Sequence, residues 1–359
     1  MKKNEPLRTI LPTVAMFGLL ALACLDGPDV VAATELKMDQ AVEYEAGFYY
    51  TVKPGDTLWD ISQRFSDTPW QWPDLWRENE QIPNPHWIYP GERIRLFRKK
   101  DKQDIQPTEV PRITPQVETT ATVDGPAPEV HYYYSRMNRV GFIRKPPVEP
   151  SGEIFKVDED KKLIGIDDMV YLQNIATGRV TDLTPGSRWT VYRTMAPTSE
   201  RYSEQTIGTQ HYLLGALEIA RNESKYAIAK VINAYRHMQV GDLIMPYRDN
   251  APEVMVIDST PGILGKIIVS EEHTKLIGEQ VVAFIDKGAQ DNILPGQIYS
   301  IYDQESAAIG PGQRDSVVLE PVDIGSLIVL HTEQTTSTVL ITDAKRKITS
   351  DTRIRTPAK

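Results

Sequence analysis

Residues 49–62 have the sequence Tyr-Tyr-Thr-Val-Lys-Pro-Gly-Asp-Thr-Leu-Trp-Asp-Ile-Ser and are dense in local folding signals. Tyr50 and Val52 are two positions apart, which places both side chains on one face of a short strand. The pair Pro54-Gly55 follows and favours a tight turn, because proline fixes its backbone angle and glycine tolerates a positive one. The sequence therefore predicts a short strand that ends in a turn.

A helix is predicted immediately after this turn. Thr57 can cap the helix N-terminus, and Asp60 three residues later gives a near capping box. The apolar residues that follow are spaced three and four apart, so that one helix face can bury them: Leu58, Ile61 and Phe65.

A second helix and a closing strand are predicted over the residues that follow. Pro73 suits a first helical turn, and the apolar side comes from Trp72, Leu75 and Trp76, with Asn79 near the helix end. The last turn and strand are marked by four residues: Pro90, Gly91, Ile94 and Leu96. The predicted order is strand, helix, helix, strand.

This order and its landmark residues resemble the LysM domain. Residues 50–61 match the family's opening pattern Tyr-x-Val-x-x-Gly-Asp-Thr-Leu-Trp-x-Ile, and the later Asn, Asn-Pro, Pro-Gly and Ile-x-Leu match its closing half. The resemblance covers residues 49–97. It implies binding of glycans that contain N-acetylglucosamine, in a shallow groove between the first strand–helix loop and the loop before the last strand.

Carried onto this sequence, the resemblance implies a set of glycan-contacting residues: Gly55, Asp56, Thr57, Leu58, Asn79, Ile82, Asn84, Pro85, His86 and Ile88. Acetamido sugars present amide groups and one apolar ring face, so backbone groups and aliphatic or aromatic side chains suit them and no charge is required. A structural role is the alternative for each residue, because most apolar and capping residues of so small a domain must build it.

The N-terminus has the pattern of a secretory signal peptide over residues 1–33. Basic residues precede an apolar run from Ile10 to Leu25, and Gly27-Pro28 and Val31-Ala32-Ala33 follow it. We expect cleavage after Ala33, which predicts an exported protein of the periplasm or cell envelope. An uncleaved anchor is the alternative, although the apolar run is shorter than the roughly 20 residues that span a bilayer.

The chain has one cysteine, Cys24, in the sequence Ala21-Leu22-Ala23-Cys24. This stretch resembles a bacterial lipoprotein cleavage box, so lipidation at Cys24 is the alternative that gives the protein a membrane anchor. Cleavage after Ala33 instead removes the cysteine, and disulfides and thiolate chemistry are then excluded.

The rest of the chain divides by composition. A short segment at 34–48 precedes the LysM-like stretch, and residues 98–130 lose hydrophobic periodicity and carry charges followed by prolines, which predicts a semi-stiff linker. Beyond it, short runs rich in Val, Ile, Tyr and Thr alternate with Gly, Pro and Asp turns, which predicts all-β structure.

An internal repeat is predicted within this β region. Pro185-Gly186 recurs as Pro295-Gly296, and Leu214-Gly215 recurs as Ile324-Gly325, at one common offset (295 − 185 = 110; 324 − 214 = 110). The predicted fold class is a small α+β domain of βααβ order, followed by an all-β region of two barrel- or sandwich-like units. These repeat units are expected at 131–250 and 251–359.

No catalytic residue, metal site or cofactor is expected. The six histidines are scattered singly, without H-x-H or H-E-x-x-H spacing, and no S-x-x-K or G-x-S-x-G motif surrounds a serine. A cell-wall hydrolase that uses a single glutamate is the alternative, although such domains are mainly helical and this region is rich in strand signals.

The formal net charge of −9 disfavours nucleic acid and anionic lipid as partners, because both need clustered Lys and Arg. The expected partner is the glycan strand of peptidoglycan. An envelope protein that docks on the β repeats is the alternative partner, and the protein is then a scaffold or adaptor. Through Asn84-Pro85-His86 and Leu294-Pro295-Gly296, the chain resembles exported proteobacterial proteins with one LysM domain and a long β region, which implies no established activity for the repeats.

Overall fold

The computed structural model describes most of the chain beyond the N-terminal region. The described residues are 45–66, 68–96, 129–158, 161–173, 183–197, 207–309 and 315–358. The predicted signal peptide, Cys24 and nearly all of the predicted linker at 98–130 lie outside them. Within these ranges, no helix has the length and apolar character needed to cross a membrane.

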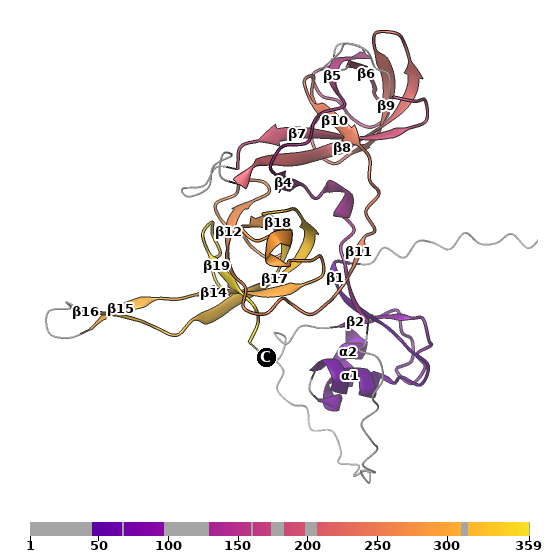
Figure 1. Cartoon of the computed structure of the whole chain (residues 1–359). Coiled ribbons are helices and arrows are strands. Elements are labelled where there is room, and N and C mark those ends of the chain that lie inside the picture. The colour runs from indigo at the N-terminus through magenta and orange to yellow at the C-terminus, as the bar shows by residue number, and fades with distance from the viewer. Residues whose placement is uncertain are drawn as a thin grey trace, which may run out of the picture. The chain divides into compact units, whose positions relative to one another are not determined.

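The N-terminal unit has the predicted order of strand, helix, helix and strand (Figure 1). Its elements are β1 (Gly47–Thr51), α1 (Leu58–Ser66), the 3-10 turn η1 (Pro69–Gln71), α2 (Trp72–Arg77) and β2 (Arg93–Leu96). Thr57 caps α1 as expected, because its hydroxyl accepts a hydrogen bond from the Asp60 N–H at 3.2 Å and donates one to the Asp60 carboxylate at 2.6 Å. The predicted small α+β domain is confirmed.

One buried cluster holds this unit together. Its members come from the strands, the helices and the loop before β2: Tyr50, Val52, Leu58, Ile61, Leu75, Ile82 and Ile94. The helix stripe predicted from the sequence supplies Leu58 and Ile61, while Phe65 packs against the cluster as a partly buried side chain. The hydrophobic spacing of α1 therefore sets which face of the helix meets the sheet.

The sheet of this unit continues into distant parts of the chain. β1 pairs with β3 (Val130–Tyr133), and β3 pairs with β11 (Glu253–Met255), which gives the sheet order β11-β3-β1-β2. Phe48 meets Tyr132 edge to face, with ring centroids 4.8 Å apart. The N-terminal unit is thus joined to the β region by main-chain hydrogen bonds, as well as by the covalent chain.

The first part of the β region is a ring of antiparallel strands. Its strands are β5 (Gly152–Val157), β6 (Met169–Gln173), β7 (Arg188–Met195), β8 (Thr209–Asn222), β9 (Ala227–Ala234) and β10 (Leu243–Pro246). The sheet order is β8-β7-β10-β5-β6-β9, and an additional β8–β9 pairing closes the ring. The short strand β4 (Phe142–Arg144) pairs with β8 outside the ring.

The second part is a closed barrel with the order β12-β13-β18-β17-β14-β19 (Figure 1). Its strands are β12 (Leu264–Ser270), β13 (Val282–Ile285), β14 (Ile298–Asp303), β17 (Val322–Thr332), β18 (Ser337–Ala344) and β19 (Arg353–Arg355). In chain order, β5, β6, β7, β8, β9 and β10 correspond to β12, β13, β14, β17, β18 and β19. Each strand of the first ring has the same neighbours as its counterpart in the barrel. The hairpin β15 (Ser306–Ile309) and β16 (Asp315–Val318) lies between β14 and β17.

Two glycines occupy matching positions in these rings. A Cβ added at Gly215 would lie 2.2 Å from the Asn233 carbonyl oxygen, and one at Gly325 would lie 2.3 Å from that of Asp343. Such contacts are far shorter than van der Waals distance, so the neighbouring strand reaches its place only because these positions lack a side chain.

We therefore expect Gly215→Ala and Gly325→Ala each to lower the free energy of unfolding by about 1 to 3 kcal/mol, because the opposing backbone must shift. The matched control is Gly278→Ala, where an added Cβ meets no described atom within 4 Å. Urea unfolding curves of the three variants measure the difference. An unchanged midpoint for either ring variant contradicts the close approach.

Candidate functional site

A groove lies on the N-terminal unit between the strand–helix turn and the loop before β2. It encloses about 250 Å³, and its lining is largely apolar and aromatic: Asp56, Thr57, Leu58, Trp59, Trp72, Pro85, His86 and Ile88. One wall comes from the start of α1, and the other comes from the loop that follows α2. The groove is thus formed by segments that are remote in sequence, which the fold of the unit brings together.

The turn that leads to the first wall is held by the Asp56 side chain. Gly55 has a φ of 91°, a backbone conformation that L side chains rarely adopt. The Asp56 carboxylate accepts hydrogen bonds from the Tyr50 hydroxyl at 2.6 Å and from the Lys53 N–H at 2.8 Å. Burial and this hydrogen bond to Asp56 raise the pKa of Tyr50 to about 12. The Asp56 carboxylate therefore stabilises the turn through these two hydrogen bonds.

An aromatic side chain extends the first wall beyond the turn. Trp59, on the first turn of α1, lines the groove next to Leu58. Its ring meets that of Trp70 edge to face, with centroids 4.8 Å apart. Trp70 is 66% exposed and does not line the groove. One tryptophan of this pair thus lines the groove, and the other contacts it from outside the groove.

The second wall is a loop fixed by its own short hydrogen bonds. The Asn84 side-chain oxygen accepts a hydrogen bond from the His86 N–H, and the Asn84 carbonyl oxygen accepts one from the Trp87 N–H, both at 3.0 Å. The exposed His86 ring lies 6.4 Å from the Trp72 ring, measured between centroids. Pro85, His86 and Trp72 all line the groove.

The structure places the sequence-predicted residues in two groups. Those that line the groove are Asp56, Thr57, Leu58, Pro85, His86 and Ile88. The others lie in the framework of the domain: Gly55 in the turn, Asn84 in the loop, and Asn79 and Ile82 in the interior, where they are 0% and 5% exposed. A contact between glycan and any of these residues stays a prediction.

Trp59 and Trp72 line the groove although they were not among the predicted contacts. The signal for Trp59 was its place in the Gly-Asp-Thr-Leu-Trp motif, directly after the predicted contact Leu58. Trp72 had no comparable signal, because its wall is formed by tertiary contact with the loop before β2. Sequence spacing alone therefore does not show which aromatic residues near a predicted loop line the groove.

The buried amide of Asn79 joins α2 to the closing strand. Its nitrogen donates to the Leu75 carbonyl at 2.7 Å and to the Arg95 carbonyl at 3.0 Å, while its oxygen accepts from the Arg95 N–H at 2.7 Å. These bonds satisfy buried main-chain groups at the end of the helix and in β2. Asn79 is therefore a structural residue of the domain.

We expect Asn79→Ala to lower the free energy of unfolding by about 2 kcal/mol or more, because the main-chain groups of Arg95 lose their partner. The control is Gln81→Ala, which removes an exposed side chain that hydrogen-bonds to the Asn79 oxygen. Tryptophan fluorescence during urea unfolding follows this unit. Equal losses in the two variants contradict the bridging role of Asn79.

Comparison with known proteins identifies this unit. Residues 50–97 match the family model of the LysM domain. The LysM domain supports a glycan-binding role of the peptidoglycan or chitin type, and such domains are typical of extracellular or cell-envelope proteins.

The chain is also 37% identical over 57 residues to the uncharacterized protein YqbP of Bacillus subtilis (strain 168). This match covers 13% of the chain and 26% of that relative, so it spans about a quarter of the relative's length. The aligned stretch is of the size of the LysM domain alone.

Proposed function

We propose that the LysM domain holds the glycan strands of peptidoglycan in the groove between the α1 start and the loop before β2. The observation that carries this proposal is the convergence of Trp59, Trp72 and Ile88 with the polar edges of Thr57 and His86 in one groove. A pocket with apolar and aromatic walls and a few polar groups suits a ligand with an apolar face and hydrogen-bonding edges.

The chemistry of N-acetylglucosamine fits this lining. One face of its ring carries C–H groups, which can pack on an indole, and its acetamido and hydroxyl groups can pair with hydroxyl, imidazole and main-chain groups. Because the Asp56 carboxylate accepts hydrogen bonds from Tyr50 and Lys53, the groove offers little free charge. A neutral glycan therefore suits it better than an ionic ligand.

The proposal is tested by titrating the protein with soluble oligomers of N-acetylglucosamine and following its indole N–H resonances by NMR. The chain has six tryptophans, and two of them line the groove. We expect the signals of Trp59 and Trp72 to shift in a saturable way, while that of Trp189 in β7 stays in place. Glucose oligomers, which lack the acetamido group, serve as the control ligand. Unchanged groove indoles would overturn the proposal.

We further propose that the protein is a non-catalytic, exported component of the bacterial envelope. The predicted signal peptide and the envelope setting typical of LysM domains support this location. A single LysM domain is expected to bind weakly, so stable residence on the wall depends on the polymeric ligand and on further contacts of the chain.

We also propose that the two rings of the β region are copies of one repeat that acts as an envelope scaffold. The identical order of strand neighbours and the common offset of 110 residues support the repeat. Gly215 and Gly325 each pair with the last residue of the neighbouring strand, Ala234 and Ala344 respectively. A scaffold role is favoured by the exposed apolar residues of the hairpin β15–β16, Val317 and Val318.

A further inference from the structure

Each ring extends an arm at the same place. In the first ring, β7 and β8 continue beyond the pair Tyr192–Leu213, and in the barrel the chain continues beyond the pair Tyr302–Asp323. The two segments have equal length (213 − 192 = 21; 323 − 302 = 21). We call the described residues 193–197 and 207–212 the first arm, and residues 303–309 and 315–322 the second arm. Figure 1 shows β15 and β16 of the second arm extending from the barrel.

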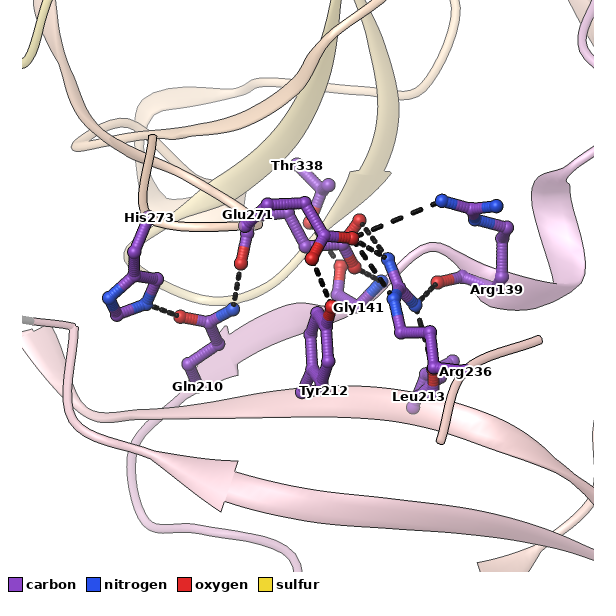
Figure 2. Close-up of polar contacts among 10 residues, drawn as sticks. Arg139, Gly141, Gln210, Tyr212, Leu213, Arg236, Glu271, His273 and Thr338 are labelled. Carbon is purple, nitrogen blue, oxygen red and sulfur yellow. Dashed lines mark hydrogen bonds and ion pairs between the residues drawn. The ribbon is translucent and has the colours of Figure 1, made fainter. Parts of the chain in front are cut away.

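The first arm packs on the outside of the barrel. Ile207, which is 8% exposed, belongs to one buried cluster with Ile268 and Phe284 of the barrel, and Ile143 of β4 joins them. The Gln210 side chain donates to the Glu271 carbonyl at 2.9 Å and is 2.7 Å from the His273 imidazole (Figure 2). The barrel face formed by Ile268 and Phe284 is therefore covered by the first arm together with β4.

The first ring carries a matching face that is more exposed. Strand pairing aligns Ile267 and Ile285 of the barrel with Ile154 and Leu172 of the first ring. One residue further along the strands, Phe155 and Tyr171 are the counterparts of Ile268 and Phe284. Ile268 is fully buried, whereas Phe155 is 37% exposed.

This matching face is aromatic. The Phe155 and Tyr171 rings lie 6.3 Å apart, and the Tyr171 and Tyr226 rings lie 5.9 Å apart, measured between centroids. We call Phe155, Tyr171 and Tyr226 the aromatic face. Phe155 is exposed, and Tyr171 and Tyr226 are partly exposed. Aromatic side chains that reach a folded surface as a cluster are a common feature of protein interaction sites.

The second arm is correspondingly apolar and exposed. Val317 stands at the position of Ile207 (317 − 207 = 110), yet it is 42% exposed. Its neighbours Val318, Leu319 and Val322 are 61%, 43% and 52% exposed. Within one chain, the first arm has the barrel to pack on, but no third ring follows the barrel in the described residues.

We propose that the second arm docks on the aromatic face of a second copy of this chain. In this contact, the second arm of one copy packs on the first ring of another copy, as the first arm packs on the barrel within one copy. Because the arm and the face are different surfaces, the contact is heterologous and joins copies head to tail in a ring or an open row.

Such an assembly carries several LysM domains, which raises the strength of wall binding without any new glycan contact. The inference nevertheless does not depend on glycan binding, since it concerns only the β region. Its test is therefore made in solution without glycan, and its failure leaves the groove proposal untouched.

The test is sedimentation velocity of the chain from Thr34 onward over a range of concentrations. The arm variant combines Val317→Asp with Leu319→Asp, and the face variant is Phe155→Asp. The matched control is Leu163→Asp: Leu163 is 67% exposed, and its barrel counterpart Leu276 stays 60% exposed although the first arm covers the barrel, so this position lies outside the expected footprint.

For the wild type and the control, the average mass is expected to rise with concentration beyond that of a dimer. The arm variant and the face variant should each remain monomeric. Mixed in equal amounts they should form a heterodimer that grows no further, because one copy supplies the intact face and the other supplies the intact arm. A monomeric wild type, or a mixture that does not associate, would overturn the proposal.

Discussion

Replacing Arg236 with methionine is expected to lower the free energy of unfolding by about 3 to 5 kcal/mol, because it leaves a buried carboxylate without its cation. Arg236 is 8% exposed at its side chain, and its guanidinium lies 2.9 Å from the carboxylate of Glu271, which is 3% exposed (Figure 2). The guanidinium also donates to the carbonyl oxygens of Arg139 at 2.8 Å and Leu213 at 2.7 Å. One side chain thus joins the first ring to the start of the barrel unit.

The pH dependence of this loss follows from the carboxyl group. Burial raises the pKa of Glu271, and Arg236 and the Gly141 N–H, which donates at 2.6 Å, oppose that effect. A group whose pKa is higher in the folded than in the unfolded state contributes stability at low pH and loses it as pH rises. Since Arg236→Met removes the opposing cation, its deficit against the wild type should be larger at about pH 8 than at about pH 5.

A double-mutant cycle separates this ion pair from simple loss of packing. Arg236→Met combined with Glu271→Gln should be more stable than Arg236→Met alone, because the unpaired charge is removed. Arg188→Met is the surface control: its pair with Glu218 is 3.5 Å long and both side chains are well exposed, so a loss below about 1 kcal/mol is expected. Equal losses for Arg236→Met and Arg188→Met in urea unfolding contradict the account.

The second large effect is expected in ligand binding. Trp59→Ala should weaken the affinity for N-acetylglucosamine oligomers at least about tenfold, or ~1.4 kcal/mol, because it removes an aromatic wall of the groove. The loss should appear in isothermal titration calorimetry, while the midpoint of thermal unfolding changes little, since Trp59 is only partly buried.

Trp70→Ala is a closely matched control for this substitution. It deletes the same edge-to-face ring pair as Trp59→Ala, but Trp70 does not line the groove. Its affinity should remain within about twofold of the wild type. If the two variants lose affinity equally, the ring pair rather than the groove wall determines binding.

The LysM fold was predictable from the sequence because its determinants are local. The Thr57 cap, the Leu58 and Ile61 stripe and the turn at Gly55 each act within a few residues, and the structure has all of them. The all-β structure of the remaining chain was also predictable from local signals, because it depends on short β-branched runs and turn residues.

The features that could not be predicted from the sequence depend on contacts between segments distant in the chain. The addition of β3 and β11 to the LysM sheet joins residues 80 or more positions apart, and no pattern within either strand specifies it. The groove shows the same limit: Asn79 belongs to the family pattern, yet its amide is buried between α2 and β2, whereas Trp72 reaches the groove through tertiary contact.

This sheet also decides how the LysM domain should be tested. Deleting the domain would remove β1 and expose the edge of β3, whose pairing with Gly47–Tyr50 would be lost. An exposed strand edge promotes non-specific association, so a truncated chain would be a poor control in a pelleting assay. Point substitutions in the groove avoid this problem.

The most direct test is co-sedimentation of the chain from Thr34 onward with purified insoluble peptidoglycan. The account predicts that the wild type and Trp70→Ala enter the pellet, that soluble N-acetylglucosamine oligomers release them, and that Trp59→Ala stays in the supernatant. A wild type that does not pellet, or a Trp59→Ala variant that pellets as well as the wild type, would contradict glycan binding in the LysM groove.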